Sequence, residues 1–361
     1  MSGSLKIIYS LHRPLSEPIW ICKWVCQFIN SKECPKNISL LPISFYKFLV
    51  KNLASLYAKG KFSPVMQKGV PSEFAIKTNL EFIQSNNGIL DSKLHAILCK
   101  RNNNVERTVY SVYKAASYYI NLTYRIFDLF DNKFNLRTEG KDLTKFPKYP
   151  YSISAKTKAI LFKLILEKDA NFFIPLCISL KMTDSKADVL RILYNFLKDH
   201  YGVIKFDYTN SSNSNYFEVR LAWIEELYLL DKHKNIRRGF LKIILANENY
   251  KKIYDESNKE ITLLGRQFTK YLKLKNIFEK VYNNLSKTDS NPDGYVSLYK
   301  IKERMKLGYA RFQNFLNTFY LYEHRENFHI FTSNVIVSID KRKRFKIDGV
   351  EALYIKIIRI K

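Results

Sequence analysis

Residues 309–324, YARFQNFLNTFYLYEH, decide how the last quarter of the chain is interpreted. Aromatic and aliphatic side chains recur there every three or four positions, which is the period of a helix with one buried face. The predicted inward face comprises Phe312, Phe315, Leu316, Phe319 and Tyr320. The residues left for the other faces are polar, namely Arg311, Gln313, Asn314, Asn317 and Thr318. The stretch therefore predicts a helix that can offer short polar side chains to a partner.

The segments on either side of this helix predict the rest of a small module. Residues 268–287 have the pattern of a first helix, and the breaker TDSNPDG at 288–294 ends it. A short strand (295–298), a second helix (299–306) and a tight turn at Leu307 and Gly308 lead into the third helix. Strand-like segments follow at 328–333, 334–340 and 352–360.

A basic tract lies between these strand-like segments and is predicted to form the tip of a hairpin. Its cations are Lys341, Arg342, Lys343, Arg344 and Lys346. Exposed Lys and Arg at such a tip can neutralise phosphates without reading a base sequence. Two alternatives stay open: a nuclear localisation signal, which fits a tail better than a hairpin, and a solvated turn that binds nothing.

This order of elements resembles the winged helix-turn-helix superfamily. The resemblance implies that the third helix lies in the major groove with Arg311, Asn314 and Asn317 toward the bases, while the hairpin holds the backbone. It also implies a fold that is mainly α with small β-hairpins (α+β), built from tandem winged-helix modules. Such tandems are similar to those of plasmid replication initiators, restriction-enzyme recognition domains and polymerase accessory subunits, and the sequence does not choose among them.

A second winged-helix module is predicted at 151–224. Helical patterns at 156–168 and 171–181 precede a longer helix that begins near Thr183 or Asp184 and ends at Gly202. Residues 203–208 and 216–221 alternate as strands do and predict a hairpin. Lys186 and Arg191 on the longer helix are candidate nucleic-acid contacts. Because the predicted wing is neutral, a structural or partner-binding role fits this module equally well.

The remaining chain divides into three further predicted parts, and no strict sequence repeat is visible in it. Residues 1–70 form an N-terminal helical extension with a first strand at 5–11, and residues 71–150 form a helical or winged-helix-like module with wing strands near 124–130 and 133–138. A helical connector spans 225–265, ahead of the C-terminal module at 266–361. Its basic cluster contributes the candidate contacts Lys234, Arg237 and Arg238.

Composition favours a polyanionic partner. Lys and Arg number 60 against 33 Asp and Glu, which gives a net charge of +27. Such a charge opposes compaction and acts as a long-range field for polyanions, although a Lys-rich composition also arises from an AT-rich genome. The most apolar early stretch, 18–29, is too short for a membrane span, which needs about 20 apolar residues. We therefore expect an intracellular, cytoplasmic protein without a membrane span.

The sequence gives little support for catalysis, a metal or a cofactor. Cys22, Cys26 and Cys34 with His12 match no zinc motif, and all five cysteines are interpreted as buried thiols. Residues 289–300 begin like an EF-hand, but the position of the bidentate Glu is Lys300. Asp207 with Glu218 is the one carboxylate pair that suggests a metal-dependent nuclease. We expect no enzyme activity, no catalytic residue and no cofactor.

Two hypotheses of different classes follow. The leading one is a non-enzymatic protein that binds duplex DNA through its C-terminal module, as a replication initiator, regulator or recognition subunit. The alternative is a nucleic-acid-binding subunit of a multi-protein complex, such as an RNA-guided antiviral effector, in which RNA and protein partners share the basic surface. A metal-dependent nuclease is the third.

Overall fold

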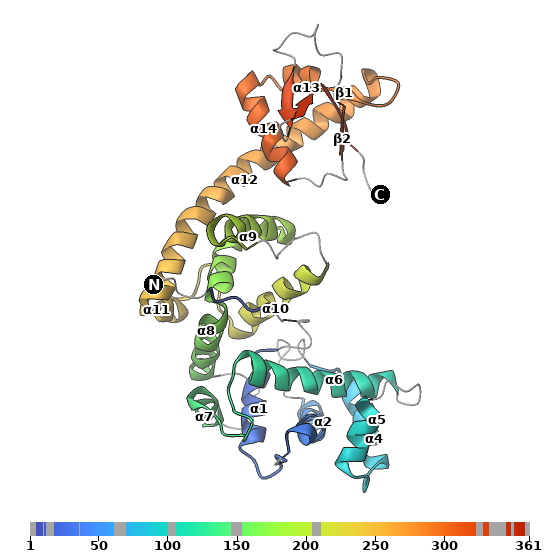
Figure 1. The fold of residues 1–361 in the computed structure, drawn as a ribbon, viewed down its shortest axis with the longest axis vertical. Coiled ribbons are helices and arrows are strands. Elements are labelled where there is room, and N and C mark those ends of the chain that lie inside the picture. The colour runs from blue at the N-terminus through green and yellow to red at the C-terminus, as the bar shows by residue number, and fades with distance from the viewer. Residues whose placement is uncertain are drawn as a thin grey trace. The chain divides into compact units, whose positions relative to one another are not determined.

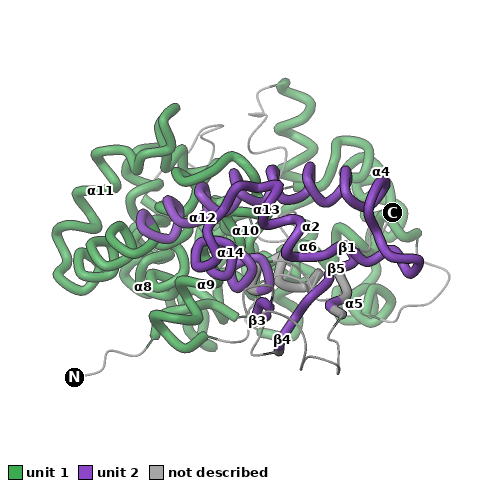
Figure 2. Tube along the Cα trace, turned by 90° about the horizontal axis from the view of Figure 1, so that it is seen from above, with its two compact units in different colours: residues 1–261 green, residues 262–361 purple. Residues whose placement is uncertain are grey.

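A computed structural model describes residues 5–9, 11, 18–35, 37–60, 70–99, 106–145, 154–203, 211–322, 328–331, 344–347 and 350–357 (Figure 1). The chain divides into two compact units, residues 1–261 and 262–361, which Figure 2 draws in different colours. The described part is mainly helical with a few small antiparallel strand pairs. The coarse fold class, mainly α with small β elements, is therefore confirmed. No described helix is long and apolar enough to cross a membrane.

The regular elements in the described residues of the first unit are helices, joined by loops and extended segments. Its elements are α1 (Ile21–Ile29), η2 (Ile38–Leu40), α2 (Leu41–Ala58), α4 (Glu73–Ser85), α5 (Asp91–Cys99), α6 (Arg107–Asn121), the π-turn η3 (Leu122–Ile126), α7 (Thr138–Thr144), α8 (Ala155–Ser179), α9 (Lys186–Tyr201), α10 (Ser211–Leu227) and α11 (Arg238–Leu245). Helix α12 (Glu248–Thr288) spans the boundary between the units. The strands expected at 5–11 and in the 71–150 module are wrong where the chain is described, since only an isolated bridge between Phe130 and Leu136 forms there.

A buried ion pair explains why residues 5–9 are not a strand. Arg220 lies on α10 and holds Asp169 of α8 through two bonds of 2.6 and 2.7 Å, and both side chains are fully buried. Asp169 leaves helical geometry (φ −140°) and accepts the backbone N–H of Ile8 at 2.9 Å. The Ile8 carbonyl accepts a bond of 2.8 Å from Arg220. These bonds satisfy the backbone of an extended segment that has no sheet to join.

The second predicted module is wrong in its wing. Residues 216–221 lie inside α10, so they are helical rather than a strand. Their alternation of apolar and polar residues is short, and the buried side of the helix is completed by Val219, Trp223 and Leu227, which continue at helical spacing. The helices before the wing form as expected, with a break at Asp169, and Ser185 caps α9 in place of Thr183 or Asp184. Gly202 ends α9 in the left-handed region at φ 66°.

The second unit follows the predicted order of elements as far as strand β2. After α12 come β1 (Val296–Ser297), α13 (Leu298–Arg304), α14 (Tyr309–Tyr322), β2 (Phe328–Phe331), β3 (Phe345–Ile347), β4 (Val350–Ala352) and β5 (Tyr354–Ile357). One antiparallel sheet has the order β1-β5-β2, and β3 pairs with β4 in a separate hairpin. The last strand thus lies between the two earlier ones.

Aromatic side chains form the core between α12 and α14. Phe278 packs against Phe315 and Phe319, each with ring centroids 5.2 Å apart, and Tyr271 stacks on Phe315 at 5.9 Å. These residues were predicted to face inward, and each is buried. Ile277, which was also expected to face inward, is 46% exposed, because only one narrow side of α12 is covered there.

The hairpin after β2 differs from the expectation. Residues 345–347 are a strand, with Phe345 and Ile347 buried and Lys346 exposed, so they are not part of a hairpin tip. Phe345 explains this difference, since its ring packs between Tyr309 and Phe312 of α14 with centroids at 5.2 and 5.0 Å. Lys341, Arg342 and Lys343, and the strand expected at 334–340, lie outside the described residues.

Candidate nucleic-acid interface

The exposed side of α14 carries the three residues predicted to reach bases. Arg311, Asn314 and Asn317 recur at every third position and are all exposed. The opposite side is fixed by Phe312, Phe315, Leu316 and Phe319, which are at most 3% exposed. Gln313 Nε2 donates to Asn317 Oδ1 at 2.9 Å, so part of this polar row is held in place. The side chains that could contact a partner therefore stand on a rigid helix.

Strand β3 is attached to α14 by polar bonds as well as by Phe345. Gln313 accepts the backbone N–H of Lys346 at 2.9 Å and donates to its carbonyl. The Tyr309 hydroxyl donates to the Arg344 carbonyl at 2.7 Å. Two of the predicted phosphate contacts, Arg344 and Lys346, thus come from a segment that lies directly beside the candidate reading helix. Lys346 is exposed, whereas Arg344 is largely covered and lies 3.8 Å from Glu351.

The two candidates on α9 are already engaged within the first unit. Lys186 Nζ lies 3.0 and 3.1 Å from the two carboxylate oxygens of Glu218 on α10. Arg191 is largely covered and lies 3.9 Å from Asp188. Glu218 was also half of the suggested nuclease pair, and its partner Asp207 lies outside the described residues. A lysine that pairs with this carboxylate competes with a metal ion for it.

The candidates of the connector fall in and after a tight loop. Lys234 donates to the Thr183 carbonyl at 3.3 Å and pairs with Asp184. The hydrogen bond from Lys234 holds the pKa of the Asp184 carboxyl below its usual value. Arg237 is exposed, and its Nε donates to the Leu230 carbonyl at 3.1 Å. Arg238 is exposed at the start of α11. Lys234 thus has a structural role, and the two arginines lie on the surface.

This loop is one of two copies that the sequence reading missed. Residues 128–137, the first loop, and residues 228–237, the second loop, are 100 positions apart. In each, a backbone N–H of arginine donates to a leucine carbonyl at 2.9 Å: Arg137 to Leu129, and Arg237 to Leu229. Each contains one isolated antiparallel bridge, and each is followed directly by a short helix, α7 or α11.

An aspartate closes the first loop. Asp131 Oδ1 accepts the backbone N–H groups of Lys133 and Asn135 at 2.8 and 2.9 Å, and Oδ2 accepts the Asn135 side-chain amide at 3.0 Å. These bonds, led by the Asn135 side chain, lower the pKa of the Asp131 carboxyl. Asp128 and Phe134 adopt positive φ values of 54° and 62°. A phenylalanine rarely adopts a positive φ, so we infer that the bonds accepted by Asp131 hold the turn in this conformation.

The second loop repeats this geometry with different side chains. Asp231 Oδ1 accepts from the backbone of His233 and Asn235 at 2.8 and 2.9 Å, and the Asn235 bond leads in lowering the pKa of Asp231. Tyr228 and Lys234 take the positive φ values, 53° and 59°. The signal in the sequence is the shared Leu, Asp, Asn and Arg of LFDNKFNLR (129–137) and LLDKHKNIR (229–237). It is short, and the helices around it differ, which hides it from an inspection of element order.

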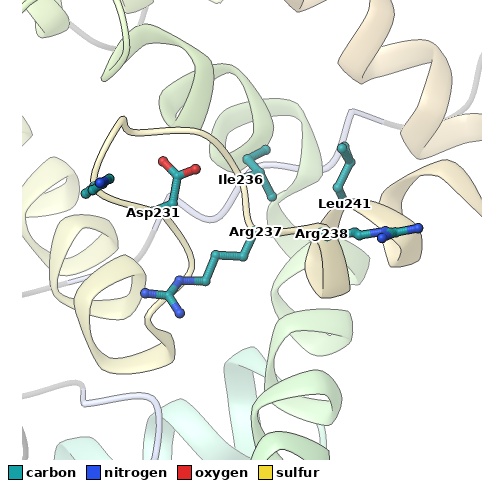
Figure 3. A pocket seen from close by; sticks show the side chains of 6 residues that line it. Asp231, Ile236, Arg237, Arg238 and Leu241 are labelled. Atoms are coloured by element: carbon teal, nitrogen blue, oxygen red, sulfur yellow. The ribbon is translucent and has the colours of Figure 1, made fainter.

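An open hollow of about 770 Å³ lies on the second loop and α11. It is lined by Asp231, Lys232, Ile236, Arg237, Arg238 and Leu241. Figure 3 shows Ile236 and Leu241 pointing to the same side, while Arg237 and Arg238 extend in opposite directions. The lining of the hollow thus combines two apolar side chains with three cations and one acid.

The remaining sequence candidates for a metal site are not brought together in the described part of the chain. Lys300 binds Asp289 at 2.6 Å and so occupies the place of a cation in the EF-hand-like turn. No group of three or more His, Cys, Asp and Glu side chains gathers among the described residues. The expectation of buried thiols is confirmed for Cys22, Cys26 and Cys177. It is wrong for Cys34, which is only partly buried, and for Cys99, which is exposed beside His95 and Tyr113. Comparison of the chain with protein-family models, curated proteins and solved structures finds no match.

Proposed function

We propose that the protein binds duplex DNA without catalysis, through a winged-helix module in its second unit. The observation that carries this proposal is the row of Arg311, Asn314 and Asn317 on the exposed side of α14, with Lys346 of the neighbouring strand β3 bonded to the same helix. The order of helices and strands, with β5 between β1 and β2, supports the winged-helix assignment. Asn can pair with adenine and Arg with guanine in the major groove, which a helix of this kind enters.

The division of labour between helix and hairpin follows from side-chain chemistry. Arg344 and Lys346 neutralise phosphates next to the groove, and Lys341, Arg342 and Lys343 extend this contact. Phosphate contacts set affinity and its salt dependence, whereas base contacts set sequence preference. The net charge of +27 supplies the field that brings DNA to the surface.

The test is binding of the full chain to duplex DNA, single-stranded DNA and RNA across a salt series. With five phosphate contacts, the affinity for duplex falls with about the fourth to fifth power of salt concentration. Replacement of the four residues 341–344 by Ala flattens this slope. Replacement of Arg311, Asn314 and Asn317 by Ala leaves the slope nearly unchanged and removes the preference among duplex sequences in a selection from random DNA.

A matched control removes cations from the same unit away from this face. Lys273 and Lys280 are exposed on α12, and their replacement by Ala should change the salt slope far less than the 341–344 variant does. Equal changes of the salt slope in the two variants would mean that overall charge attracts DNA and that residues 341–344 make no specific phosphate contacts. A salt dependence that is flat for the wild type would reject the proposal.

A further inference from the structure

The helices that follow the two loops carry different side chains at positions that correspond in the backbone. Lys141 on α7 corresponds to Leu241 on α11, and both backbone N–H groups donate to the arginine carbonyl four residues earlier, at 2.8 and 3.0 Å. Lys145 corresponds to Leu245, which is 42% exposed. The first copy has thus placed lysines in solvent where the second copy has leucines. Since the backbone does not require leucine there, an unexplained apolar surface is left on the second copy.

The apolar surface continues from exposed Leu245 through half-buried Leu241 to Ile236, and the last two line the hollow. Ile236 is half-exposed, whereas its counterpart Leu136 is buried at 8% exposure. Leu241 and Leu245 are one turn apart on α11, so with Ile236 they form a line of apolar side chains. Contiguous apolar surface of this kind on a charged protein marks a site of interaction.

A second line, of cations, runs beside the first. Arg238 and Lys242 are also one turn apart on α11 and are exposed, and Lys232 and Arg237 extend the positive charge across the loop. The one acid in the hollow, Asp231, already accepts the two backbone N–H groups of its own loop. The surface therefore presents an apolar line with a basic line along its side.

We propose that this surface, Ile236, Leu241 and Leu245 with Arg238 and Lys242, docks an amphipathic helix of a partner protein that carries acidic residues beside its apolar face. A helix matches the one-turn spacing of both lines, as in other helix-in-groove complexes. Carboxylates on one edge of it face Arg238 and Lys242, which fixes its direction and register. Nucleic acid fits less well, because a phosphate backbone gains nothing from exposed leucines.

The experiment uses the full chain and a fluorescent synthetic peptide with Leu and Ile on one helical face and Glu beside them. The decisive variant replaces both leucines with the residues of the first copy, Leu241→Lys with Leu245→Lys. Docking predicts that its affinity for the peptide falls at least about tenfold, as expected when buried leucine contacts are lost. Purely electrostatic attraction predicts the opposite, because the variant gains two positive charges, and unchanged or tighter binding would overturn the proposal.

The controls separate folding and charge from docking. Lys141→Ala with Lys145→Ala in the first copy should leave peptide binding unchanged, and Arg238→Glu should weaken it. Both leucines are at least partly exposed, so the decisive variant should melt like the wild type by circular dichroism. Absence of saturable binding to the wild type would overturn the proposal. It would also be overturned if duplex DNA displaced the peptide and bound the two-lysine variant more tightly, since the surface would then be a nucleic-acid contact.

Discussion

The first and second loops fold alike, yet the protein packs them differently. Phe130 and Leu136 of the first loop are 0% and 8% exposed, while their counterparts Leu230 and Ile236 are half-exposed. Helix α7 after the first loop packs closely on both α1 and α8, whereas the close packing of α11 within the described chain is on α8. The two loops thus share their shape along with their backbone and aspartate bonds, and the other side chains decide what each copy faces.

Helix α1, which packs on α7, is held at its start by Glu226, a residue just before the second loop. Glu226, in the last turn of α10, accepts the backbone N–H groups of Ile19 and Trp20 at 2.9 and 3.4 Å, at the start of α1. Burial raises the pKa of this carboxyl to about 8, and Glu225 adds to the rise. The two copies are thus linked through one buried acid.

The largest expected effect concerns Glu226 and pH. Between the ordinary carboxyl pKa of 4.5 and about 8, the folded chain keeps a proton that the unfolded chain loses. The contribution of Glu226 to the free energy of unfolding is therefore fully present below the lower value. It decreases as the pH rises toward the higher value, by up to about 1.4 kcal/mol per pH unit. Glu226→Gln has no proton to lose there and should remove this slope.

The measurement is urea unfolding of wild type and variant from pH 5 to pH 8, followed by tryptophan fluorescence. The three tryptophans, Trp20, Trp24 and Trp223, all lie in the first unit and report on it alone. Glu225→Gln, at an exposed neighbouring position, is the control and should leave most of the slope in place. Parallel slopes for wild type and Glu226→Gln would show that another group titrates.

A smaller effect is expected from two glycines in the helices after the loops. A Cβ on Gly140 in α7 would lie 2.6 Å from the Leu129 carbonyl oxygen, whereas a Cβ on Gly239 in α11 would meet nothing within 4 Å. Gly140→Ala should destabilise the first unit by about 1–3 kcal/mol through overpacking. Gly239→Ala should stabilise it by up to about 1 kcal/mol, because alanine loses less backbone entropy.

Both glycine variants can be unfolded in urea with the same tryptophan signal. A loss of stability of equal size in both would mean that α11 is packed as tightly as α7, and the contrast between the copies would fail. If instead neither variant changed the midpoint, the close approach of Gly140 to the first loop would have no energetic weight.

The sequence predicted periodic elements well and irregular ones poorly. Helix α14 and the order of the second unit could be predicted, because a 3.6-residue period over many residues is a strong signal. Phe345 and Lys346 were wrongly assigned to the hairpin tip, because Phe345, the aromatic residue inside this basic tract, packs on Tyr309 and Phe312. No local pattern reveals such a tertiary contact. Residues 216–221 show the converse, a short alternation that the buried face of a helix also produces.

The candidate site divides in the same way. The exposure of Arg311, Asn314 and Asn317 could be predicted from the helical period. The pairing of Lys186 with Glu218 and of Lys234 with Asp184 could not, because it depends on how distant helices pack. The repeated loop was present in the sequence as four shared residues, but its significance required the positive φ values and the aspartate bonds.

The smallest effect expected is local and separates the turn's own bonds from its surroundings. Asp131→Ala and Asp231→Ala each remove the acceptor of two backbone N–H groups. Amide hydrogen exchange at Asn135 and Asn235 measures how often each loop opens. We expect faster exchange at both, and a larger acceleration at Asn235, since half-exposed Leu230 and Ile236 hold the second loop less firmly than buried Phe130 and Leu136 hold the first. Equal accelerations would mean that the aspartate bonds alone keep both loops closed, and that the different packing of the two copies serves their partners rather than their stability.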